Sequence, residues 1–123
     1  LKEALTDSRR TLKPNGTLGA VQHASPDNLP DEWSGGQNGY LKERAVIAEI
    51  EAAGFEFMGG SNINFNPKDK PTVADTVWRL APTLSGSKNN SSPQATMREI
   101  GESNRMTLLF RKRSNDGELA LFR

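Results

Sequence analysis

The sequence contains a single histidine, His23, and places it just past a short apolar run. That run, residues 17–21, lacks polar alternation, which is typical of a strand buried on both faces of a parallel sheet. In open α/β sheets, ligand crevices lie at the carboxyl ends of such strands. An imidazole with an ordinary pKa of about 6.5 accepts a proton near neutral pH. We therefore predict His23 as a catalytic general base; the alternative is a hydrogen bond to the loop backbone.

Tyrosine and asparagine side chains supply further candidates for contact with a substrate. Tyr40 begins a predicted helix directly after Gly39, where it would face the same crevice or serve as a packing residue at the helix start. Asn62, Asn64 and Asn66 alternate along and beyond a strand end, and alternation directs them to one face. They would present amides to a polar substrate, although asparagine is also common near turns for backbone reasons.

A tryptophan and an arginine complete the set. Trp78 lies in a long irregular segment, where it would close over a bound ligand by an apolar or cation–π contact or anchor the segment to the core. Arg105 precedes the last predicted strand. Its guanidinium would either clamp a substrate carboxylate or pair with Asp69 or Glu102.

Charge and residue inventory exclude several classes of protein. With 16 basic and 15 acidic residues, the formal charge of +1 provides no field for nucleic acid or for anionic lipid. The absence of cysteine excludes disulfides and cysteine zinc sites, and the carboxylates lack EF-hand spacing, so we expect no metal. No apolar run approaches the roughly 20 residues of a membrane span. The cytoplasm is the default location, with the periplasm left open.

The elements that position these residues follow from apolar spacing and from turn residues. We predict helices over 1–12 and 40–53, strands over 17–21, 55–65 and 106–110, and a loop over 24–38. Residues 66–104 form a long excursion with a helical turn near 94–100, and 119–122 would be an edge strand or part of a frayed tail. A bulge or break is expected at Gly59-Gly60.

This order predicts an α/β fold in which the last two strands form an antiparallel hairpin with a long inserted connection. Few strands are available to cover one another, which makes the sheet incomplete by itself. The sequence also begins with Leu1, already inside a helical pattern. We therefore expect an upstream portion, and we expect the isolated chain to be marginally stable or to associate with itself through an exposed sheet edge.

Several segments resemble a known family. The turn Leu12-Lys13-Pro14-Asn15-Gly16 resembles the LKPGG turn common before the fifth strand of class I S-adenosylmethionine-dependent methyltransferases. Five blocks, in order, are similar to a group of uncharacterised bacterial predicted methyltransferases, and together they cover most of residues 1–113: GTLGAVQH, GYLKERAVIAEIEAAGF, NINFNPKD, VWRLAPTL and IGESNRMTLLFRK.

The resemblance implies that residues 1–113 are the C-terminal half of a Rossmann-like, seven-stranded methyltransferase domain, followed by a tail over 114–123. The family's glycine-rich cofactor loop and its acidic partner would precede these residues, because the glycines at 35–39 lack the required spacing. S-adenosylmethionine is the implied cosubstrate, a small molecule the implied acceptor, and the isolated chain would be inactive. The alternative is a non-catalytic α/β module that binds a protein through its sheet edge and through the 66–104 excursion.

Overall fold

The computed structural model describes residues 2–85 and 91–113 of the 123-residue chain. The predicted tail at 114–123, with its edge strand at 119–122, lies outside the described residues. Helices and strands follow one another in nearly the predicted order: α1 (Lys2–Thr11), β1 (Thr17–His23), α2 (Glu43–Ala52), β2 (Phe55–Ser61), the 3-10 turn η1 (Val77–Arg79), α3 (Ser91–Ile100) and β3 (Arg105–Lys112).

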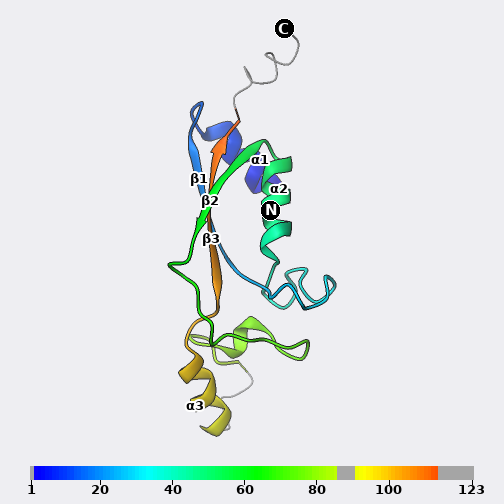
Figure 1. Ribbon diagram of the computed structural model, residues 1–123, viewed down its shortest axis with the longest axis vertical. Helices are drawn as coiled ribbons and strands as arrows, with labels where there is room; N and C mark the ends of the chain where they lie inside the picture. The colour runs from blue at the N-terminus through cyan, green and yellow to red at the C-terminus, as the bar shows by residue number, and fades with distance from the viewer. Residues whose placement is uncertain (1, 86–90, 114–123) are drawn as a thin grey trace.

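The three strands form one sheet in the order β1-β3-β2, with β3 antiparallel to both neighbours (Figure 1). The pairing of β2 with β3 confirms the antiparallel hairpin and its long connection. The register shifts between Phe57 and Gly59, next to the predicted break. Because both outer strands are antiparallel to β3, β1 and β2 run in the same direction. Their carboxyl ends therefore lie at the same end of the sheet.

Both N-terminal helices lie on the same face of the sheet (Figure 1). Alternate residues of β3 point toward them, as the pleat of a strand requires. The main core therefore forms between α1, α2 and this face, from the buried side chains Leu5, Val46, Ile50, Phe55, Met106, Leu108 and Phe110. None of the helices in the described residues is long and apolar enough to cross a membrane.

The prediction that β1 is buried on both faces of a parallel sheet is wrong for this chain. Among the described residues, β1 pairs with β3 alone, in antiparallel fashion, and forms one edge of the three-stranded sheet. On the face opposite the helices, Val21 is 54% exposed, and Leu109 is 46% exposed. A short apolar run reads the same whether or not its second face is covered, because periodicity reports residue type and not the neighbours.

A smaller cluster attaches the long excursion to the end of the sheet. Trp33 and Tyr40 stack with ring centroids 5.3 Å apart, and Val77 packs against them. Gly39 lies between the two segments at φ +88°, and a Cβ there would come within 2.1 Å of Val77 Cγ1. Only glycine therefore allows this close approach. Within the excursion, α3 begins before the predicted helical turn at 94–100 and includes it.

Candidate functional site

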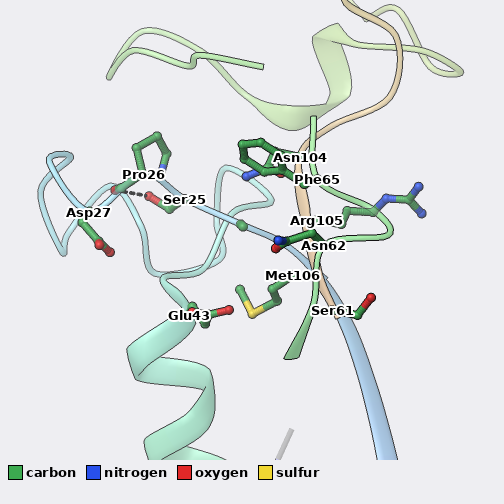
Figure 2. Close-up of a pocket in the computed structure, with 11 residues that line it drawn as sticks. Ser25, Pro26, Asp27, Glu43, Ser61, Asn62, Phe65, Asn104, Arg105 and Met106 are labelled. Carbon is green, nitrogen blue, oxygen red and sulfur yellow. Dashed lines mark hydrogen bonds between the residues drawn. The ribbon is translucent and has the colours of Figure 1, made fainter. Parts of the chain in front are cut away.

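The carboxyl ends of β1 and β2 and the start of β3 lie at the same end of the sheet. A hollow of about 240 Å³ lies there, on the helix side (Figure 2). Its lining combines residues that follow both strands with the first residue of α2: Ala24, Ser25, Pro26, Asp27, Glu43, Ser61, Asn62, Phe65, Asn104, Arg105 and Met106. The hollow lies beyond the carboxyl ends of β1 and β2, which run in the same direction on either side of the antiparallel β3.

The side chains around this hollow differ in character from one side to the other. Figure 2 shows the carboxylates of Asp27 and Glu43 on one side, with Phe65 and Asn62 across from them. Phe65 is 59% exposed, so a large apolar surface borders the opening. The guanidinium of Arg105 points away from the two carboxylates (Figure 2). The hollow could therefore accept a molecule with an apolar part and a hydrogen-bonding part.

A second hollow, of about 190 Å³, lies beside His23. Residues 77–83 form one wall, and residues 102 and 103, just before β3, form another. The lining residues are His23, Val77, Trp78, Leu80, Ala81, Pro82, Thr83, Glu102 and Ser103. The structure therefore brings together His23 and Trp78, which were predicted from segments 55 residues apart. Trp78 stays 45% exposed, which leaves much of the indole free to contact a ligand.

The imidazole of His23 is held by a side chain and not by loop backbone. Its Nδ1 atom lies 2.5 Å from the hydroxyl oxygen of the buried Ser103. The pKa of His23 is lowered, first by burial and then by the positive charge of Arg105, while Asp69 and Glu102 act in the opposite direction. The ring is therefore neutral at pH 7 and able to accept a proton.

This lowered pKa predicts a pH dependence of folding stability. The unfolded chain, with a His pKa of about 6.5, binds more protons than the folded chain at pH values between the unfolded and the folded pKa. The contribution of neutral His23 to the free energy of unfolding is thus fully present above pH 6.5. It is lost as the pH falls toward the pKa of His23 in the folded chain. We expect His23→Gln to lose less stability than the wild type between pH 7.5 and 5.5, measured by urea unfolding. Equal losses would contradict the shift.

Arg105 lies directly across the sheet from His23 in the β1–β3 register. Its Nη2 atom is 3.5 Å from Asn64 Oδ1, and its Nε atom is buried without a partner among the described residues. The predicted alternatives of pairing with Asp69 or Glu102 do not occur between residues that the structure describes. Arg105 is therefore a half-buried cation that this part of the chain leaves largely unpaired.

Asn64 lies beside Arg105, whereas Asn66 binds the backbone before β3. Asn64 donates to Thr107 Oγ1 at 2.8 Å and lies beside Arg105. Asn66 donates to the carbonyls of Ile100 and Glu102 and accepts from the Lys68 N–H, so its amide braces the backbone before β3. β2 ends at residue 61, and the predicted alternation therefore does not extend through these asparagines.

Tyr40 is fully buried in a polar network, without an exposed surface to meet a substrate. Its hydroxyl donates to Asp69 Oδ2 at 2.8 Å and accepts from Arg79 Nη1 at 3.0 Å. Arg79 Nη2 also lies 2.9 Å from Asp69 Oδ1. Burial raises the pKa of Tyr40 well above its usual range, so the phenol stays protonated. The packing interpretation of Tyr40 fits this placement, and direct substrate contact does not.

Sequence reasoning did not identify the roles of Ser103 and Asp69, which organise the site; Asp69 was considered there as a partner for Arg105. Ser103 fixes the ring of His23 from 80 positions away, and buried Asp69 accepts the Asn104 N–H at 2.9 Å in addition to the Tyr40 and Arg79 contacts. Nothing in their local sequence marks these roles, because both depend on contacts between distant segments. Among residues 2–85 and 91–113, no three His, Asp or Glu side chains gather as a metal site would require.

Comparison with known proteins shows a likeness to a solved structure. No protein-family model matches the chain, and no curated protein matches it either. Among solved structures, the crystal structure of the [4+2]-cyclase SpnF is similar, with a TM-score of 0.52 and 18% sequence identity. The likeness covers 93% of this chain and 46% of that chain. At this identity it shows a shared fold, and this chain spans about half the length of the enzyme that it resembles.

Proposed function

We propose that the chain forms the C-terminal, acceptor-side half of an S-adenosylmethionine-dependent methyltransferase with a Rossmann-like, seven-stranded sheet. The resemblance of five sequence blocks supports this, as do the antiparallel last strand and the likeness to about half of a larger enzyme. The observation that carries the proposal is the position of the His23 imidazole at the carboxyl end of β1, on the wall of a hollow and held by Ser103.

The residues present fit the acceptor and not the methyl donor. Gly35 and Gly36, in the predicted 24–38 loop, do not follow a strand directly: Gly35 forms an isolated bridge with Leu41. The Gly36 carbonyl accepts the Gly39 N–H in a turn, and Gly36 lines neither of the two hollows described above. The donor would therefore be held by an upstream half, and the acceptor small molecule by the surface around His23.

His23 has a defined role in this proposal. When Nδ1 donates its hydrogen to Ser103 Oγ, Nε2 is left as a free acceptor. A hydroxyl or amine of the acceptor, placed within hydrogen-bond distance of Nε2, gives up its proton to the ring as it becomes a nucleophile. Ser103 is a positioning residue in this proposal, because its hydroxyl orients the ring through Nδ1.

Two observations test the proposal. The coding sequence upstream of Leu1 should encode a strand, a glycine-rich turn and an acidic residue about 20 positions later. Calorimetric titration of S-adenosylmethionine into the 123-residue chain should show weak or no binding. Micromolar affinity for these residues alone, or an unrelated domain upstream, would contradict it.

A second candidate function is a non-catalytic module that binds a protein partner. It is favoured by the half-exposed side chains Val21, Met58 and Leu109 and by the outer edge of β1, with which no other described strand pairs. An upstream coding sequence without a cofactor-binding half would favour this candidate.

Under either candidate, we expect the isolated chain to associate with itself through β1. Sedimentation velocity should show a concentration-dependent shift toward dimers, because the edge strand carries no proline and is uncharged apart from His23. Val21→Lys should abolish the shift, whereas Val73→Lys, at an exposed valine outside the sheet, should leave it. A monomer at all concentrations would contradict the expectation.

A further inference from the structure

The strongest unexplained feature of the molecule is the Arg105 side chain. It projects from the first residue of β3 on the face away from the helices, next to His23 across the sheet. A guanidinium offers five N–H donors, yet the described residues provide one acceptor, Asn64 Oδ1, at the outer limit of a hydrogen bond. The Nε atom is shielded from solvent and has no partner there.

A second arginine on the same strand shows what a structural role looks like at this surface. Arg111 lies on the same face of β3 as Arg105, because the two are six residues apart. Arg111 Nη2 forms an ion pair with Glu56 at 2.7 Å on the neighbouring strand. Among the described residues, no carboxylate takes the equivalent position at Arg105.

We propose that Arg105 binds a carboxylate of the acceptor substrate, and that this contact places the acceptor nucleophile beside His23. The inference rests on the proposed function, which supplies the need for an acceptor. A planar carboxylate matches the guanidinium fork, and its two oxygens would pair with the terminal Nη1 and Nη2 donors, because the Nε atom is shielded from solvent. Asn64, held by Thr107, orients the guanidinium from the other side.

The position of Arg105 explains how one contact would serve the reaction. Residues directly opposite in an antiparallel pair have Cα atoms about 4.5–5.5 Å apart, so a carboxylate on Arg105 keeps the rest of a small molecule within reach of the His23 ring. The nearby hollow, with the exposed indole of Trp78, would take the apolar part of the same molecule. The acceptor class is therefore a small carboxylic acid that carries a hydroxyl or amine.

The test uses benzoate as a probe, with neutral benzamide as its isostere and phenyl phosphate as the tetrahedral anion. Because the chain has one histidine, its ring signals in NMR spectra report on the site without ambiguity. We expect saturable shifts with benzoate and none with benzamide. Benzoate should also raise the pKa of His23, since it neutralises the positive charge of Arg105; the charges of Asp69 and Glu102 near the ring stay unchanged.

Matched variants distinguish binding at Arg105 from a nonspecific effect of the protein's positive charge. Arg105→Gln should weaken benzoate binding about 10-fold or more, as expected for loss of a charge-assisted pair, while Arg111→Gln should leave it unchanged. If Arg105→Gln does not fold, Arg105→Lys replaces it; this variant keeps the charge, loses the planar fork and should bind several-fold more weakly.

The proposal is overturned by equal binding of benzamide, by tighter binding of phenyl phosphate, by unchanged binding in the Arg105 variants, or by no saturable shift. Its failure is distinguishable from failure of the proposed function. Benzoate binding without any methyl transfer would remove the methyltransferase and leave the carboxylate site. Methyl transfer to neutral acceptors, without benzoate binding, would remove the carboxylate site and leave the methyltransferase.

Discussion

Replacing Asp69 by alanine is expected to reduce the free energy of unfolding by about 3–5 kcal/mol, the usual result of breaking a buried ion pair on one side. The Asp69 side chain has no exposed surface and accepts hydrogen bonds from Tyr40, from Arg79 and from the Asn104 N–H. Its loss leaves the Arg79 guanidinium and the Tyr40 hydroxyl buried without this acceptor. Urea unfolding followed by circular dichroism measures the effect.

Asp75 provides the matched control. It pairs with the same guanidinium at 3.7 Å from Arg79 Nε, but its side chain is about a third exposed. Asp75→Ala should therefore cost about 1 kcal/mol or less, as is usual for solvent-accessible ion pairs. If the two variants were equally stable, Asp69 would not be the anchor that joins the excursion to the sheet end.

The second large effect concerns His23. In the longer protein that we propose, His23→Gln should lower kcat for methyl transfer by about 10²–10⁴, the range for loss of a general base, with little change in KM. In the wild type, kcat/KM should fall at acid pH as His23 becomes protonated. The midpoint of this fall should lie below the ordinary pKa of histidine, because the pKa of His23 is lowered. The acid limb should disappear in the variant.

Ser103→Ala is the companion variant for this experiment. It removes the hydroxyl that holds the His23 ring and leaves the imidazole itself, so the expected loss of kcat is smaller than for His23→Gln. The acid limb should be retained at a shifted pH, which a purely structural role would not produce. Activity of His23→Gln within a few-fold of the wild type would contradict the general-base role.

Local sequence patterns were sufficient to predict most of the elements. The apolar spacing of residues 46–53 gave the second helix, and Gly54, at φ +101°, ends it as predicted. The alternation of Phe55 and Phe57 gave β2, whose partner β3 followed from the apolar run at 106–110. These features depend on neighbouring residues, so the sequence alone reveals them.

The features that could not be predicted depend on distant contacts. The position of β1 at the edge of the sheet depends on β3, about 90 residues later in the chain, which pairs with it. The sequence predicts Tyr40 at a helix start, facing the crevice or packing there, whereas α2 begins at Glu43 and the Tyr40 hydroxyl is bound by Asp69 and Arg79 from a distant segment. His23 was found because one histidine after a strand is conspicuous, whereas its partner Ser103 is one serine among many.

Methyl transfer from isotope-labelled S-adenosylmethionine tests the central claim most directly. The assay compares the 123-residue chain with the longer protein that contains it, each given a set of small hydroxy and amino compounds that includes carboxylic acids and neutral molecules. We predict that the longer protein transfers the label and that the 123-residue chain alone does not. Transfer by the 123-residue chain alone, or none by the longer protein, would contradict the assignment of these residues to the acceptor side of a methyltransferase.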